Sequence, residues 1–158
     1  MRGLDEIDRR ILLELQRDGR LSNQDLADRV GLSPSPCLRR VRLLEESGVI
    51  AGYRAVVDQE AVGLPITAFV RITLESHGYD LVERVEAEMR QIPEIVEAYL
   101  LAGDQDYLLK VTIGSFASYE TFVRTRLRTI AGLASIETTF AFGVTKRVSP
   151  LPITGQRP

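Results

Sequence analysis

The sequence predicts an α+β protein in which an N-terminal helix-turn-helix, winged-helix-like domain is joined to a C-terminal ferredoxin-like βαββαβ domain. Three helical patterns fill the first third of the chain, and a turn of about three residues separates the second from the third. Gly63, Leu64 and Pro65 then mark a boundary. Beyond it, alternating and helical apolar patterns follow in the order strand, helix, strand, strand, helix, strand.

Length and composition are those of a small globular protein. The chain has 158 residues, of which 44% are hydrophobic and 27% are charged. No apolar run approaches the roughly 20 residues that span a bilayer, and the N-terminus lacks an apolar signal core, so we expect a cytoplasmic protein. Cys37 and His77 are the single cysteine and histidine. One chain can therefore form neither a disulfide nor a His/Cys metal cluster, and we expect no metal or cofactor.

The first domain is expected over residues 1–62 and contains three helices. The first has Asp5 as its N-cap and an apolar face formed by Leu4, Ile7, Ile11 and Leu15. The second begins at Ser22 and ends at Gly31. The third follows Ser33 or Ser35, has Pro34 or Pro36 near its first position, and stops at Gly48. Residues 49–58 then form an extended segment or a small wing.

Three arginines crowd the start of the third helix. Residues 1–60 contain ten arginines, no lysine and eleven acidic residues, so net charge alone does not indicate a nucleic-acid partner. No acidic residue, however, lies between Arg29 and Leu44. Leu38, Val41 and Leu44 are expected to face the core, whereas Ser35, Arg39 and Arg42 point outward and Arg40 lies beyond the edge of that cluster. Glu46 joins the outward face only at its far end.

This outward face has the chemistry of a DNA-reading helix. Arginine can hydrogen-bond guanine O6 and N7 or a phosphate in the major groove, and a helix N-terminus favours phosphate. Acidic residues are absent where phosphates would lie. The alternative is a solvated helix face with no partner. The turn that joins the second and third helices favours DNA binding over that alternative.

The second domain is expected over residues 63–150, followed by a proline-rich tail at 151–158. Its strands are predicted at 66–75, 95–103, 107–114 and 136–144, with helices around 81–92 and 119–130, both on one face of the sheet. The other face stays open, and at least some of the large side chains of Phe69, Tyr99, Phe140 and Phe142 must lie on it. Pairing two such sheets would cover it, which predicts a homodimer.

Asp104 and Asp106 lie on the connection between the second and third strands, beside Gly103. They could be solvated residues of a hairpin turn, two ligands of a hard metal ion, or part of an amino-acid pocket. In a pocket, an aspartate would bind the ammonium of the ligand and loop amides would bind its carboxylate. The residues alone leave these alternatives open.

Across nearly its whole length the chain resembles the Lrp/AsnC, or feast/famine, family of transcription regulators. The stretch LSPSPCLRRVRLLEESGVI at 32–50 is similar to the recognition-helix signature of the family, and AGDQD at 102–106 resembles its effector loop. The resemblance places the helix-turn-helix proper at about residues 23–42. With the charge pattern, it implies that double-stranded DNA is bound as a palindromic operator by Ser33, Ser35, Pro36, Arg39, Arg40 and Arg42.

The resemblance also implies an amino-acid effector, bound between subunits, and a dimer that assembles further to an octamer. The residues it assigns to the effector are Tyr99, Leu101, Ala102, Gly103, Asp104, Asp106, Thr138 and Thr139. Family members usually carry threonine where this chain has Ala102, so a contact through that hydroxyl is lost and the sequence leaves open whether the effector differs, binds weakly or is absent.

Two other functions are weaker alternatives. Some proteins that resemble this family are enzymes that decarboxylate haem precursors, and their chemistry uses histidines. This chain has only His77, so we expect no enzyme. A metabolic sensor that no longer binds DNA is the second alternative, and the intact face of Arg39 and Arg42 argues against it.

Overall fold

A computed structural model describes residues 3–153. The chain divides into two compact units, Met1–Val56 with Lys146–Pro158, and Val57–Thr145. We predicted a boundary at residues 62 and 63 and a separate tail from 151. In the structure the boundary lies six residues earlier, and the returning tail belongs to the first unit. Within residues 3–153, no helix is long and apolar enough to cross a membrane.

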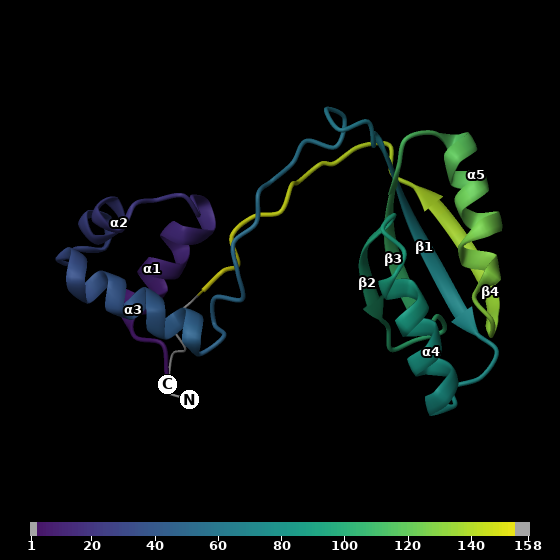
Figure 1. The fold of residues 1–158 in the computed structure, drawn as a ribbon, viewed down its shortest axis with the longest axis horizontal. Helices are drawn as coiled ribbons and strands as arrows, with labels where there is room; N and C mark the ends of the chain where they lie inside the picture. The colour runs from purple at the N-terminus through teal and green to yellow at the C-terminus, as the bar shows by residue number, and fades with distance from the viewer. Residues whose placement is uncertain (1–2, 154–158) are drawn as a thin grey trace. The chain divides into compact units, whose positions relative to one another are not determined.

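The first unit contains three helices, namely α1 (Glu6–Arg17), α2 (Asn23–Val30) and α3 (Pro34–Glu46) (Figure 1). Asp5 caps α1 as predicted, because its carboxylate accepts from the Asp8 amide while the Asp8 carboxylate accepts from the Asp5 amide. Ser22 caps α2 through the Asp25 amide. The helices enclose a core made of Ile11, Leu12, Leu26, Ala27, Val30, Cys37 and Leu44.

The turn between α2 and α3 is fixed by backbone geometry. Gly31 has φ 74°, a left-handed conformation that glycine adopts without the steric cost of a side chain. The Leu32 amide donates to the Ala27 carbonyl at 2.9 Å. Across the turn, the Asn23 amide group donates to the Pro34 carbonyl at 2.9 Å. These bonds hold the start of α3 against the start of α2, which is the predicted helix-turn-helix arrangement.

The inward face of α3 differs from the predicted one. Cys37 and Leu44 are buried and Val41 is half-buried, whereas Leu38 is exposed, so our assignment of Leu38 to the core was wrong. Cys37 occupies the centre of this face, and Leu38, the next residue, is rotated by about 100° from it about the helix axis. Burial raises the pKa of the Cys37 thiol, which disfavours the reactive thiolate and fits a packing residue.

The second unit has the element order β1 (Ile66–Leu74), α4 (Tyr79–Arg90), β2 (Ile95–Leu100), β3 (Tyr107–Ile113), α5 (Phe116–Thr125) and β4 (Leu133–Phe140), with a short 3-10 turn at Leu127–Thr129 before β4. The strands pair antiparallel in the spatial order β2-β3-β1-β4. This is the predicted ferredoxin-like plan. The last strand starts three residues before its predicted position and stops at Phe140, four residues short of the predicted end.

Both helices lie on the same face of this sheet (Figure 1). The core between them and the sheet includes Ala68, Val70 and Ile72 of β1 and the helix residues Val85, Met89, Tyr119 and Phe122. The opposite face carries Phe69 and Arg71, each paired across the sheet with β3 and β4 residues.

Of the four aromatic residues considered for the open face, at least some of which were predicted to lie on it, two do and two do not. Phe69 is paired with Lys110 and Tyr99 with Leu108 on the open face. Phe140 instead packs edge-on against Tyr119 and Phe116 on the helix side, with ring centroids 4.9 and 5.0 Å apart. Phe142 lies beyond β4 and is fully exposed.

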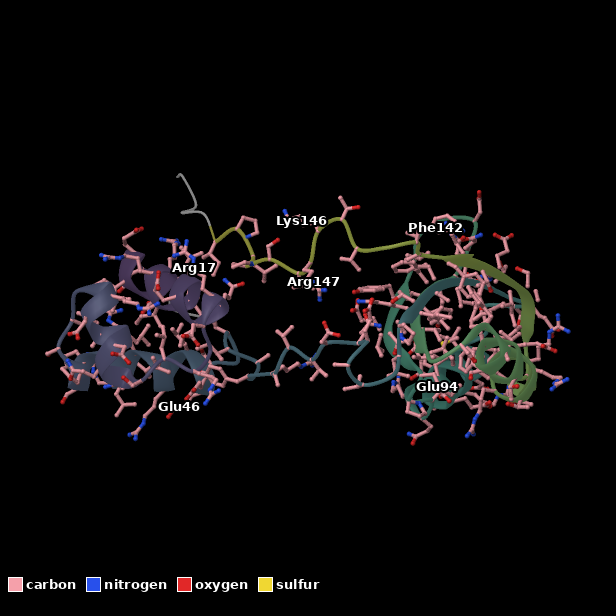
Figure 2. The ribbon with its side chains drawn as sticks, turned by 90° about the horizontal axis from the view of Figure 1, so that it is seen from above. Arg17, Glu46, Glu94, Phe142, Lys146 and Arg147 are labelled. Carbon is pink, nitrogen blue, oxygen red and sulfur yellow. The ribbon has the colours of Figure 1, made fainter. Side chains whose placement is uncertain are left out.

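The tail docks on the first unit. The Leu151 amide donates to Gln16 Oε1 at 2.6 Å, and the half-buried Ile153 packs against the core of the three helices. Both residues line a groove formed by α1 and residues 49–56, a segment that has no regular secondary structure. Figure 2 shows Arg17, at the end of α1, on the side of this unit that carries the tail, and Glu46 of α3 on the opposite side.

Candidate nucleic-acid interface and effector pocket

The outward face of α3 presents a cationic and polar surface. Ser35, Arg39 and Arg42 are exposed together with Glu46 at the far end, and they line a shallow hollow of about 490 Å³. Pro34 occupies the first helical position and Ser33 is the N-cap, whose side chain makes no capping hydrogen bond. Ser33 and Pro36 are also exposed. The first turn of α3 therefore offers hydroxyls and amides beside two exposed guanidinium groups.

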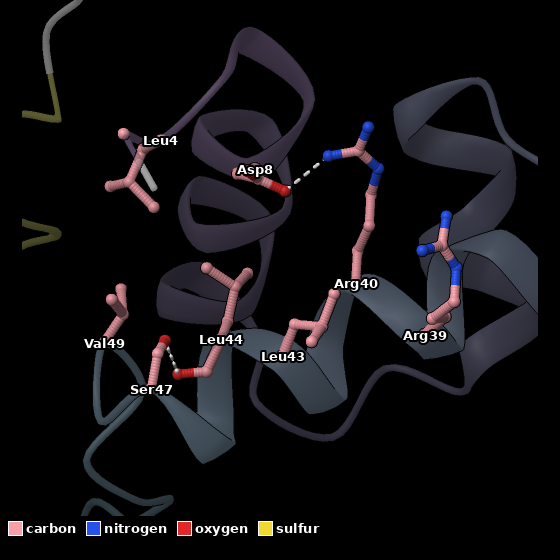
Figure 3. Close-up of a pocket in the computed structure, with 9 residues that line it drawn as sticks. Leu4, Asp8, Arg39, Arg40, Leu43, Leu44, Ser47 and Val49 are labelled. Atoms are coloured by element: carbon pink, nitrogen blue, oxygen red, sulfur yellow. Dashed lines mark hydrogen bonds and ion pairs between the residues drawn. The ribbon is translucent and has the colours of Figure 1, made fainter. Parts of the chain in front are cut away.

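Arg40 does not share this surface. Its guanidinium donates to Asp5 and to Asp8 of α1, each at 2.7 Å, and only 21% of its side chain is exposed. Figure 3 shows the ion pair that joins Arg40 to Asp8, whereas Arg39 lies farther from Asp8 and has no such contact with it. The amide of Asp8 and then Arg40 lower the pKa of Asp5, and the two carboxylates raise the pKa of Arg40. Its charge already joins α3 to α1, so Arg40 is less available to DNA than Arg39 and Arg42, and its contact with DNA stays a prediction.

Two residues that the sequence analysis did not assign to the site flank this surface. Leu38 is 38% exposed on one side of it and Leu43 is 46% exposed on the other. Leu43 borders two hollows. One is the hollow that Ser35 and Arg42 line, and the other, of about 300 Å³, lies next to α1 (Figure 3). A helical wheel whose inward face includes Cys37 in place of Leu38 places both leucines at the edges of the outward face.

In the second unit, Asp106 is occupied by internal contacts. One carboxylate oxygen accepts from the Leu74 amide at 2.7 Å, and the other lies 2.7 Å from His77 Nε2. The Leu74 amide and then His77 lower the pKa of Asp106. His77 thus has a partner, although 72% of its side chain is exposed. The Asp106 carboxylate anchors the end of β1, which leaves it poorly placed to take a ligand ammonium.

The rest of the loop is open to solvent. Leu101, Ala102, Gly103 and Asp104 are exposed, and no hydrogen bond or ion pair of the Asp104 side chain occurs among residues 3–153. The loop is held at its ends, where the Leu101 amide donates to the Asp106 carbonyl at 2.8 Å and Gln105 donates to Glu137 of β4 at 3.0 Å. Tyr99 lies next to the loop on the open face and donates to Glu97.

Thr138 and Thr139 lie on opposite faces of the sheet, so within one chain they do not line the same surface, and their place in an effector pocket stays a prediction. Consecutive strand residues point to opposite faces of a sheet. Thr138 faces α5 and lies 2.5 Å from the Tyr119 hydroxyl, whereas Thr139 is on the open face, paired with Phe69. Only Thr139 therefore shares a face with Tyr99.

Both parts of the chain match known protein families. Residues 4–51 match the family described as winged helix-turn-helix DNA-binding, and residues 67–151 match the Lrp/AsnC ligand binding domain. These ranges correspond to the three-helix unit and to the ferredoxin-like sheet with the chain that follows it.

Relatives and solved structures agree with this assignment. The leucine-responsive regulatory protein of Haemophilus influenzae is 44% identical over 137 residues, which is 87% of this chain and 82% of that protein. A transcriptional regulator of Neisseria meningitidis, solved as a complex with L-methionine, is 36% identical with a TM-score of 0.90, over 95% of this chain and 97% of that one. The feast or famine regulatory protein of M. tuberculosis, complexed with L-methionine, is 37% identical with a TM-score of 0.81, over 92% and 96%. The chain therefore belongs to the Lrp/AsnC family of DNA-binding transcription regulators.

Proposed function

We propose that the protein is a sequence-specific regulator of transcription that reads an operator with α3. The observation that carries the proposal is the outward face of α3, where Ser35, Arg39 and Arg42 are exposed and Glu46 is the only acidic residue, at the far end. Arg39 and Arg42 contact guanine or phosphate in the major groove. Ser33, the N-cap of α3, and Pro36, in its first turn, lie against the DNA backbone. Arg40 has a structural role.

We further infer that two copies act together. The open sheet face, with Phe69 and Leu108 half-buried and Tyr99 exposed, supplies the surface on which a second sheet packs. A two-fold dimer presents two α3 helices to the two halves of a palindromic operator. Assembly of these dimers to an octamer is proposed from the family resemblance.

The effector we propose is a free amino acid. Two related proteins were solved with L-methionine, and others are named as leucine-responsive. In this chain Asp104 is the better candidate for the ammonium, since Asp106 is held by Leu74 and His77. Amides of the exposed loop at 101–104 are available to the carboxylate, and Tyr99 and Thr139 lie on the open face. Regulation through binding accounts for the site without an enzymatic reaction.

Arginine substitutions test the DNA-binding proposal. We expect Arg39→Ala and Arg42→Ala each to weaken binding to a selected operator by about 1–3 kcal/mol if the arginine reads a base. Arg84→Ala, on the exposed side of α4 in the other unit, removes the same charge and should leave the affinity nearly unchanged. Gel-shift titrations at one fixed salt concentration make the comparison. Equal affinities for the wild type and both α3 variants would refute the proposal.

A further inference from the structure

We propose that Leu38 reads the 5-methyl group of a thymine in the operator. This inference rests on the proposed function, in which α3 enters the major groove. Leu38 is the fifth of the thirteen residues of α3 and is 38% exposed although Cys37, directly before it, is fully buried. It borders the same hollow as Ser35 and Arg42, one helical turn before and after it. A large apolar side chain thus lies among the groups that would read bases.

The chemistry of the groove supplies the partner. Most of the groups that base edges present in the major groove are hydrogen-bond donors or acceptors, and a leucine side chain can form a hydrogen bond with none of them. The methyl group of thymine is the apolar feature that distinguishes an A·T pair there. Contact with Leu38 would remove that methyl group from water. Burying one such group changes the affinity about fourfold, since about 0.8 kcal/mol corresponds to that ratio.

The other exposed leucine of α3 is less well placed for a base. Leu43 is the tenth residue of the helix and lies on the opposite flank of the outward face, where it borders both the hollow of Ser35 and Arg42 and the hollow beside α1. In helix-turn-helix proteins the N-terminal residues of the recognition helix contact base edges. Leu38 belongs to that half and Leu43 does not. Leu43 is therefore a matched control, with the same side chain at similar exposure on the same helix.

Uracil substitution isolates the methyl group. A duplex is first selected with the wild-type protein from a pool of random sequences, and each thymine in it is then replaced singly by uracil, which keeps base pairing and removes only the 5-methyl group. We expect wild-type affinity to fall about fourfold at one thymine in each half-site. Leu38→Ala should bind the thymine and uracil duplexes equally at that position, because the contact is already lost. Leu38→Met should keep the discrimination.

Two controls and two contrary results test the Leu38 inference. Leu43→Ala should show the same uracil sensitivity as the wild type, and circular dichroism should show Leu38→Ala to be folded, as expected for an exposed side chain. Wild-type protein that is insensitive to every uracil, or Leu38→Ala with full sensitivity, would overturn the Leu38 inference and leave the DNA-binding proposal intact. Failure of the wild type to enrich any duplex would overturn both.

Discussion

Adjacent arginines of one helix have different roles because their directions differ by 100°. Arg39 points to the outward face, whereas Arg40 points back to α1 and meets Asp5 and Asp8. The sequence showed that Arg40 lies off the outward cluster. It could not show which acidic residues meet it, because Asp5 and Asp8 lie more than thirty positions away and are brought close only by packing of α1 against α3.

Replacing Arg40 should therefore affect stability and spare DNA recognition. Arg40→Met keeps the aliphatic stem but leaves the Asp8 carboxylate, 13% exposed, without its cationic partner. We expect the free energy of unfolding to fall by about 1.5–3 kcal/mol, the usual contribution of hydrogen bonds to charged groups. Arg39→Met should change it by less than about 0.5 kcal/mol. Urea denaturation measures both.

DNA affinity gives the second comparison for the same two variants. At a temperature where both are folded, Arg40→Met should bind the selected operator like the wild type, and Arg39→Met should bind it more weakly. A stable Arg40→Met protein with lost affinity would place Arg40 at the DNA.

At the level of helices and strands, periodicity predicts elements well where one face is buried. The alternation in β1 gave 66–75 against the observed Ile66–Leu74. It failed for β4, because Leu133 joins that strand only through its pairing with Leu74 on β1, which no local pattern reveals. Of the residues predicted on the inward face of α3, Val41 and Leu44 lie there but Leu38 does not, because the small residue Cys37 occupies the centre of that face. Docking of the tail was also missed, because it depends on a groove built by distant residues.

The docked tail should stabilise the first unit. Ile153→Asp places a charge against the core of the three helices and should destabilise that unit by about 1–3 kcal/mol, because the half-buried apolar side chain is lost and a charge takes its place. Val148→Asp, on the same tail, is the control because Val148 is 97% exposed. Hydrogen exchange of the α1 amides should be faster in the first variant and unchanged in the second. Equal protection in both would mean that the tail contact contributes nothing to the stability of the helices.

At the scale of the whole molecule, the residues proposed to bind DNA and those proposed to bind the effector belong to different units. The first has the exposed arginines, and the second has the open sheet face and the loop with Asp104. In the function proposed above, an effector that shifts DNA affinity must bind one assembly state more tightly than another. The effector's influence on assembly and its influence on DNA affinity should therefore be gained or lost together.

The full-length protein with L-methionine and with L-leucine tests this coupling. We expect at least one of them to raise the melting temperature, because a ligand of the folded state stabilises it, and to change both the oligomer size in light scattering and the operator affinity.

Asp104→Asn removes the charge that meets the ligand ammonium and should weaken binding roughly tenfold or more. Glu88→Gln, at an exposed position of α4, removes a charge elsewhere in the same unit and should bind normally. If Asp104→Asn binds the effector like the wild type, the ammonium lies elsewhere. Asp104→Asn can also bind the effector more weakly and still change its oligomer size at saturating effector. If its DNA affinity then stays unchanged, assembly and DNA recognition are uncoupled.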